Sequence, residues 1–216
     1  MTGAGDPPPR SGGGGPPKAV EGADTVSEFK NRFMHYEIHG HAIVSADDRI
    51  ADRDGVTPAA LRNETDWARF QAALDRAVVT VLGRLGHEAN PNAKGRNRLV
   101  LSSSARGIER RADAFWWNPA EVMLDDALAE AAPAGGIVAV PGGRRVFDLF
   151  LHGVGFYEFH LSRATRATVP GGIPVFTEVR AGRSAAEILA AHGLVADPPE
   201  ILDSTASVEF TLWRRP

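Results

Sequence analysis

The chain of 216 residues contains no cysteine. This absence excludes a disulfide framework, a thiolate zinc site, an iron–sulfur cluster and a cysteine nucleophile. No apolar run approaches the roughly 18 residues that a membrane-spanning helix needs. The N-terminus also lacks the basic and then apolar layout of a signal peptide. We therefore expect a soluble, cytoplasmic protein with no membrane partner.

Lysine is scarce, and the charge is nearly balanced. Only three of the 24 basic residues are lysine, at positions 18, 30 and 94, and the others are arginine. The formal net charge of −3 provides no general attraction for a phosphate backbone. We therefore expect no nucleic-acid partner.

Glycine and proline are concentrated at the start of the chain. Residues 1–24 hold seven of the 23 glycines and five of the 15 prolines. Such a segment cannot bury apolar area. The composition predicts a disordered tail over residues 1–30 and one folded domain over residues 31–216.

Short apolar runs alternate with helical patterns from Tyr36 onward, which is typical of an α/β domain. Runs at 37–44, 78–82, 98–101 and 137–140 are short and rich in Val, Ile and Leu, as in parallel strands buried on both faces. Segments 156–161 and 207–214 alternate apolar and polar residues. We predict them to be antiparallel strands toward an edge of the sheet.

Helices are predicted from their caps and apolar stripes. One covers Glu64–Arg76, and a second follows Gly142-Gly143. A third begins at Asn118-Pro119-Ala120-Glu121, which combines a cap, a first-turn proline and a glutamate. A capping box formed by Ser184 and Glu187 begins a fourth helix, which ends at Gly193.

Glycines follow several of the predicted strands. The segment Val140-Pro141-Gly142-Gly143-Arg144 runs from a buried strand through two glycines into a helix. Such a turn points backbone N–H groups and a helix N-terminus at a ligand, and α/β proteins bind phosphates there. Gly83-Arg84, Gly95-Arg96 and Ser102-Ser103 also border predicted strands. The alternative is a set of tight turns and solvated charges without a ligand.

Asp66 borders the apolar stripe of the Glu64–Arg76 helix, at helical spacing from Phe70. A carboxyl group there could be partly buried, have a raised pKa and bind a polar heterocycle. The alternative is an exposed carboxylate that complements the helix dipole or pairs with Arg69.

His39 and His41 share one face of a predicted strand and could in principle ligate a metal ion. No motif supplies a third ligand, so we expect structural roles for both and no metal site.

Taken in order, these features resemble the dihydrofolate reductase superfamily, which includes the riboflavin-pathway pyrimidine reductases. The resemblance runs from about Glu37 to Arg215. It rests on six stretches: Ala46-Asp47-Asp48-Arg49-Ile50-Ala51, Leu82-Gly83-Arg84, Gly95-Arg96 before Leu99-Val100-Leu101-Ser102-Ser103, Gly142-Gly143-Arg144-Arg145-Val146-Phe147, Phe156-Tyr157-Glu158-Phe159-His160-Leu161-Ser162, and Thr211-Leu212-Trp213-Arg214-Arg215.

The resemblance implies a three-layer α/β sandwich of the dihydrofolate reductase-like type. Its central mixed sheet would be mostly parallel, with an antiparallel C-terminal strand. It also implies bound NADPH. The cofactor pyrophosphate would lie at Gly142, Gly143, Arg144, Arg145 and Val146, where the family often has a cis peptide between the glycines. The adenosine phosphates would lie near Gly83, Arg84, Ser102 and Ser103, and the nicotinamide near Val44 and Ser45.

For the substrate, Asp66 matches the carboxylate that holds the pterin ring. Arg96 matches the arginine that binds an anionic tail, and Phe70 and Ser162 would line the same site. The implied reaction is hydride transfer to a pterin, a pyrimidine or a related heterocycle. Many pyrimidine reductases of this type are dimers, which implies a homodimer.

The sequence departs from the family at two functional positions. The stretch from Gly55 to Leu61 has Pro58 but lacks the usual tryptophan. Gly86 stands where a threonine hydroxyl usually helps to bind phosphate. These departures favour an alternative, a non-catalytic nucleotide-binding module that retains the fold.

Overall fold

The structure is a computed structural model that describes residues 36–216. The tail predicted over residues 1–30 lies outside the described residues. Within the described part, no helix is both long and apolar enough to span a bilayer.

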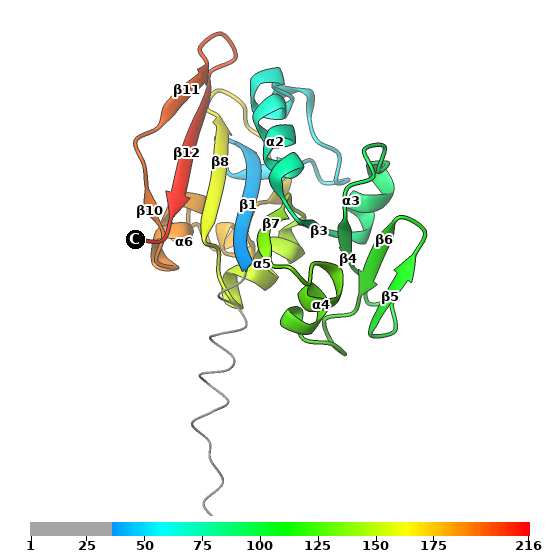
Figure 1. Cartoon of the computed structure of the whole chain (residues 1–216). Helices are drawn as coiled ribbons and strands as arrows, with labels where there is room; N and C mark the ends of the chain where they lie inside the picture. Colours follow the sequence, from blue (N-terminus) through cyan, green and yellow to red (C-terminus); the bar gives the residue numbers. More distant parts are fainter. Residues whose placement is uncertain (1–35) are drawn as a thin grey trace, which may run out of the picture.

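A central sheet organises the described chain, in the order β10-β12-β8-β1-β7-β3-β4-β6-β5, with β11 paired to β12 (Figure 1). The six strands from β8 to β6 in this order run parallel, whereas β12 and β5 run antiparallel to their neighbours. The strands are β1 (Tyr36–Ser45), β3 (Val79–Gly83), β4 (Arg98–Leu101), β5 (Ile108–Arg111), β6 (Ala114–Trp117), β7 (Gly136–Val140), β8 (Glu158–Ala164), β10 (Val195–Ala196), β11 (Glu200–Asp203) and β12 (Val208–Arg214). A small separate ladder joins β2 (Arg49–Ala51) to β9 (Ile173–Pro174).

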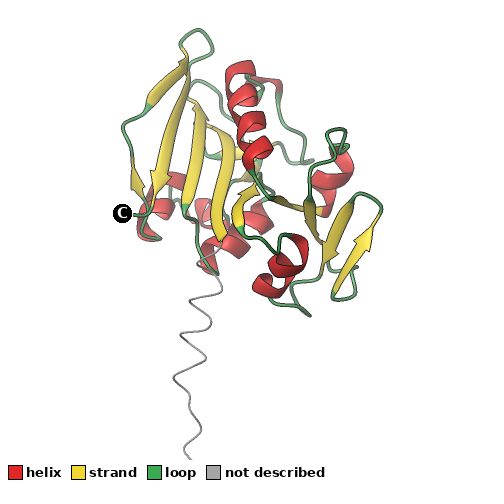
Figure 2. Cartoon of the chain, in the orientation of Figure 1, coloured by secondary structure: helices red, strands yellow, loops and turns green. Residues whose placement is uncertain are grey.

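Helices cover both faces of this sheet (Figure 2). They are α2 (Glu64–Arg76), α3 (Arg84–Ala89), α4 (Leu124–Ala131), α5 (Arg144–His152) and α6 (Ala185–Ala191), with 3-10 turns η1 (Ala59–Leu61) and η2 (Thr177–Ala181). Phe70 of α2 contacts His41 on one face of β1. Phe147 of α5 contacts Phe159, which packs on the opposite face at Gly40. The predicted three-layer α/β class, with a mostly parallel sheet and an antiparallel C-terminal strand, is confirmed.

Five phenylalanines fill the layer between the sheet and α5. Phe147, Phe150, Phe156, Phe159 and Phe176 are all 0% exposed, and their rings meet in tilted and edge-on pairs. The ring of Phe159 lies against the backbone of β1 at Gly40, where a Cβ would meet Phe159 Cε2 at 2.5 Å. Gly40 therefore lets the aromatic layer approach the central strand.

Local signals predicted several elements closely. The α2 helix has the predicted bounds, and the side chain of Asn63 caps it by accepting a hydrogen bond from the Asp66 amide. The capping box of Ser184 and Glu187 begins α6. The left-handed Gly193 (φ 83°) follows its end.

Two predictions about elements are wrong. The predicted edge strand at 156–161 is β8, which lies inside the sheet between β1 and β12 and runs parallel to β1. Its polar residues lie under α2 rather than at an edge. The helix predicted from Asn118 begins at Leu124 instead. The Asn118 and Glu121 side chains hydrogen-bond each other, and the indole of Trp117 donates to the Val122 carbonyl, so this stretch is held as a turn.

Candidate functional site

The strand order brings most of the predicted site residues to one edge of the sheet. Neighbouring strands β8, β1, β7, β3 and β4 are parallel, so their carboxyl ends meet there. Along this edge lie Ser162 near the end of β8, Val44 and Ser45 at the end of β1, Gly142 and Gly143 after β7, Gly83 at the end of β3, and Ser102 and Ser103 after β4. Residues from five separate segments of the sequence therefore line one continuous edge.

Asp66 and Ser162 are bonded to each other at this edge. Asp66 lies in the first turn of α2, and the Ser162 hydroxyl donates a short hydrogen bond to its Oδ1. Burial raises the pKa of the Asp66 carboxyl, while the Ser162 hydrogen bond and the charge of Arg69 oppose that rise. Arg69 lies over the Phe210 ring and 3.4 Å from Glu200, so Asp66 is not simply the exposed half of an ion pair with it.

Aromatic side chains of α2 and histidines of the sheet lie beside Asp66. The Phe70 ring is 5.9 Å from His41 and 5.5 Å from Trp67, whose side chain is well exposed. The ring of His41 lies 4.4 Å from that of His160 and is tilted against it. Burial lowers the pKa of His160 to about 4 and that of His41 to about 2, so both rings are neutral at pH 7.

The glycine pair after β7 forms an open backbone turn. Gly142 has φ 120° and Gly143 has φ 84°, a region that side chains disfavour, and the peptide between them is trans rather than the cis form that the resemblance implied. A Cβ on Gly142 would lie 3.2 Å from the buried ring of Phe147. The α5 helix begins directly afterwards, and its first amides have no partner within the helix.

Arginines accompany this turn. Arg144 and Arg145 are the first residues of α5, and Arg144 Nε is buried without a hydrogen-bond partner in the described part of the chain. A cation, free amides and a glycine cradle are the groups that bind a pyrophosphate. The residues present therefore fit the pyrophosphate of a dinucleotide.

Gly83 lies next to the same turn. A Cβ on Gly83 would be 3.5 Å from Val146 Cγ2, and one on Gly143 would be 3.7 Å from the same atom. Arg84, which follows Gly83, is half exposed and bonds both oxygens of Glu88 at 2.9 Å. The structure therefore brings the Gly83-Arg84 turn and the glycine pair together, with Arg84 engaged by its own helix.

The remaining predicted site residues differ in their exposure and in whether their side chains already have hydrogen-bond partners. Ser102 is buried and bonds Ser104 at 2.9 Å, whereas Ser103 is exposed. The Arg96 guanidinium bonds Asp75 Oδ1 at 2.5 and 2.9 Å and Gln71 Oε1 at 2.8 Å. Gln71 and Asp75 belong to α2 and follow Asp66 in that helix. Because Asp75 already bonds the Arg96 guanidinium, the carboxylate of a ligand would have to displace Asp75 in order to bind Arg96.

Sequence reasoning missed an ion pair that holds this edge together. The buried Asp48 lies 2.5 Å from Arg163 Nη2 and accepts the Ala185 amide at 3.0 Å, which ties the loop after β1 to β8 and α6. Arg163 also donates to the Ser45 carbonyl. The only sequence signal was the Asp47-Asp48 pair directly after a predicted strand.

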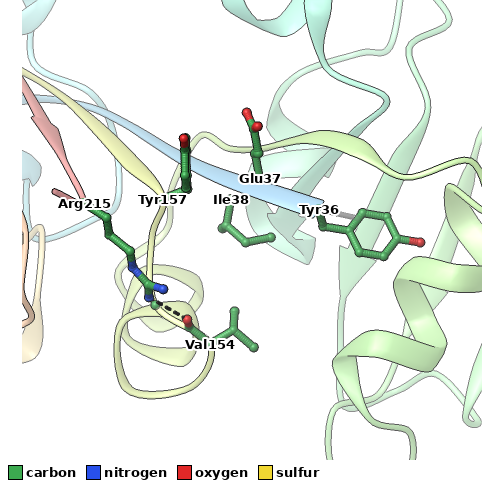
Figure 3. Close-up of a pocket in the computed structure, with 7 residues that line it drawn as sticks. Tyr36, Glu37, Ile38, Val154, Tyr157 and Arg215 are labelled. Carbon is green, nitrogen blue, oxygen red and sulfur yellow. Dashed lines mark hydrogen bonds between the residues drawn. The ribbon is translucent and has the colours of Figure 1, made fainter. Parts of the chain in front are cut away.

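A hollow of about 250 Å³ lies at the other end of β1. Figure 3 shows Tyr36, Glu37 and Ile38 from β1 beside Val154, Tyr157 and Arg215, whose Nη2 donates to the Val154 carbonyl at 2.8 Å. Val44 and Ser45 occupy the opposite end of the strand. This hollow is therefore not part of the predicted site.

Comparison with known proteins rests on structure. No protein-family model matches the chain, and no curated protein matches its sequence. A protein from Shewanella sp. PV-4 named for riboflavin biosynthesis is 19% identical with a TM-score of 0.60, over 83% of this chain and 99% of its own. Dihydrofolate reductase from Enterococcus faecalis, in complex with NADP(H), is 15% identical with a TM-score of 0.57, over 83% and 96%.

A bifunctional protein from Thermotoga maritima is also similar. It is a diaminohydroxyphosphoribosylaminopyrimidine deaminase/5-amino-6-(5-phosphoribosylamino)uracil reductase, 16% identical with a TM-score of 0.57, over 88% of this chain and 60% of its own. The chain therefore has the dihydrofolate reductase-like fold. At these identities the likeness establishes the fold, and the activity has to be argued from the site.

Proposed function

We propose that this chain is an NADPH-dependent reductase that transfers a hydride to a pterin, a pyrimidine or a related heterocycle. One observation carries the proposal. A partly buried carboxyl with a raised pKa, Asp66, is bonded to Ser162 at the same sheet edge as the Gly142-Gly143 turn. The residues predicted from separate segments for substrate and cofactor binding thus lie along one edge.

Asp66 would recognise the polar edge of the heterocycle. Ser162 occupies one direction of its Oδ1, which leaves Oδ2 to accept hydrogen bonds from ring N–H and amino groups. A raised pKa increases the fraction of the carboxyl that is protonated at a given pH. The protonated carboxyl can pass its proton to a ring nitrogen of the substrate as the hydride is transferred. Phe70 would provide the apolar wall beside the ring.

The backbone and arginines would hold the cofactor. The α5 amides, Arg144 and Arg145 would bind the pyrophosphate, and Arg84 and Ser103 would bind the adenosine phosphates. Bound NADPH supplies the hydride, while the protein supplies orientation and electrostatics. Arg84 would have to exchange Glu88 for a phosphate.

A non-catalytic nucleotide-binding module is the second candidate. Gly86 leaves α3 without the expected hydroxyl, and both Arg84 and Arg96 are already paired with carboxylates. This candidate predicts NADPH binding without turnover. A homodimer and a cytoplasmic location remain predictions under either candidate.

The test is NADPH oxidation by the purified full chain, with dihydrofolate and with 5-amino-6-(5-phosphoribosylamino)uracil. We expect Asp66→Asn to lower kcat/KM by about 100-fold or more, because the proton donor is lost, with NADPH affinity unchanged. Glu64→Gln is the matched control, since Glu64 is an exposed acid in the same first turn of α2.

The outcomes separate the candidates. Equal loss in both variants, or none in Asp66→Asn, would contradict the role of Asp66. NADPH binding without turnover of either substrate would exclude both named substrates and favour the non-catalytic module. Failure to bind NADPH would refute the proposal as a whole.

A further inference from the structure

Three potential metal ligands gather at the amino-terminal half of β1 and β8. His160 Nε2 lies 3.1 Å from Glu158 Oε2, and His39 Nδ1 lies 3.7 Å from the same oxygen. One ligand atom from each of the three residues lies within 4.8 Å of the others. The side chains are 11%, 22% and 17% exposed for His39, Glu158 and His160, so the cluster is sheltered yet reachable from solvent.

The parallel pairing of two strands creates this cluster. His39 lies opposite Glu158 and His41 lies opposite His160 in the β1–β8 register. Since alternate residues of a strand share a face, all of these side chains project under α2. The sequence showed the pair His39 and His41 but no third ligand, because the other ligands come from a strand 119 residues away (His39 to Glu158).

The separations suit a zinc ion. A tetrahedral ion with ligand bonds of 2.0–2.1 Å holds its ligand atoms about 3.3 Å apart, which lies between 3.1 and 3.7 Å. The gap from His39 Nδ1 to Glu158 and the gap between the two imidazoles, which is at most 4.8 Å, would both have to shorten. Two imidazoles with one carboxylate form a ligand set that zinc uses when it keeps one position open.

A second carboxylate supports His39 from behind. His39 Nε2 is buried, has no hydrogen-bond partner within residues 36–216 and lies 3.4 Å from Glu37 Oε2. When a histidine binds a metal through one nitrogen, the other commonly donates to a carboxylate, which fixes the ring. A small rotation of His39 would give its orphaned nitrogen that partner.

We propose that His39 Nδ1, Glu158 Oε2 and His160 Nε2 bind one Zn²⁺ ion, with water in the fourth position. The ion links β1 to β8, the two strands whose carboxyl-terminal ends carry Val44 and Ser162. Two residues that line the hollow of Figure 3, Glu37 and Tyr157, lie against His39. This inference does not depend on the reductase proposal.

A second His–Glu–His cluster provides an internal control. His152, Glu178 and His192 also meet within 4.8 Å, but Glu178 is already bonded to Arg183. An arginine on the only carboxylate competes with a cation, so we expect no zinc there. Replacing His192 therefore serves as a control, because it removes a histidine from a His–Glu–His cluster that we expect not to bind zinc.

The test is zinc titration of the full chain without a histidine tag, by calorimetry and by competition with a chelator. We expect one Zn²⁺ per chain, and a loss of affinity of at least about tenfold in His39→Gln, Glu158→Gln and His160→Gln. His192→Gln should bind as the wild type does. Zinc should also raise the melting temperature of the wild type and His192→Gln, but not that of Glu158→Gln.

Other outcomes overturn the proposal. They are no stoichiometric binding at micromolar zinc, undiminished binding in Glu158→Gln, or binding lost only in His192→Gln. Circular dichroism checks that each variant is folded. If His39→Gln misfolds, Glu158→Gln decides the test, because it preserves the size of the side chain and removes only the anionic oxygen.

Discussion

Replacing Gly142 by alanine tests the glycine turn through both stability and cofactor binding. At φ 120° a side chain strains the backbone by about 1–3 kcal/mol. The new Cβ would also lie 3.2 Å from Cε2 and Cζ of Phe147, whose ring is 0% exposed and packed at 5.3 Å from Phe159 and 6.0 Å from Phe176. Because that ring has little room to move, we expect a total loss of about 2–4 kcal/mol.

The assay is urea unfolding of the variant beside Gly182→Ala. Gly182 also has a positive φ, of 86°, but a Cβ there would meet no atom of the described residues within 4 Å. The control therefore reports backbone strain alone, about 1–2 kcal/mol. Gly142→Ala should be the less stable of the two by about 1 kcal/mol or more.

Cofactor binding provides the second readout. If the pyrophosphate rests on this turn, the displaced amides should weaken NADPH binding by about tenfold or more in folded Gly142→Ala, a loss of about 1.4 kcal/mol. Binding by Gly182→Ala should be unchanged. A folded Gly142→Ala variant with the stability of Gly182→Ala and wild-type NADPH affinity would refute the reasoning.

Two further predictions concern the core and the acid. Gly40→Ala should lower the free energy of unfolding by about 1–3 kcal/mol or more, because a Cβ would collide with the buried ring of Phe159. Urea unfolding measures this loss. A variant as stable as the wild type would show that β1 and the aromatic layer are not so closely packed. Because burial raises the pKa of Asp66, its contribution to stability is present below the ordinary carboxyl pKa and is lost as pH rises through the raised pKa. Asp66→Asn should therefore gain stability relative to the wild type between pH 4 and pH 7, and a pH-independent difference between the two would contradict the raised pKa.

Local patterns determined the individual elements. The α2 helix was predictable because Asn63 caps it and Trp67, Phe70 and Leu74 recur at helical spacing. Strands β3, β4 and β7 were predictable because Val, Ile and Leu fill both of their faces. The alternation of apolar and polar residues led to the wrong prediction that β8 lies at an edge of the sheet. In the sequence, polar residues that face a site beneath a helix cannot be told from polar residues that face solvent.

The residues of the candidate site also divide into those that the sequence indicated and those whose contacts only the fold revealed. Glycines at strand ends were visible in the sequence, because a strand, two glycines and a helix form a local pattern. The Asp66–Ser162 bond joins residues 96 positions apart and was not predicted, although the family resemblance implied that both residues line one site. The Asp75 partner of Arg96 was not predicted, because it depends on α2 meeting a later segment in space. The Glu88 partner of Arg84 is an i,i+4 pair within α3, and it was not predicted because the helix itself was not.

The missing cysteines, by themselves, determined that the chain contains no disulfide, thiolate metal site or cysteine nucleophile. The sequence also determined which segments become strands and helices, since caps, glycines and apolar periodicity act over a few residues. Only the tertiary structure decided the order and register of the strands. That register set Asp66 against Ser162, and it set His39 beside Glu158 and His160 where the sequence offered no third ligand. The physical reason is that pairing between distant strands depends on the packing of the whole sheet.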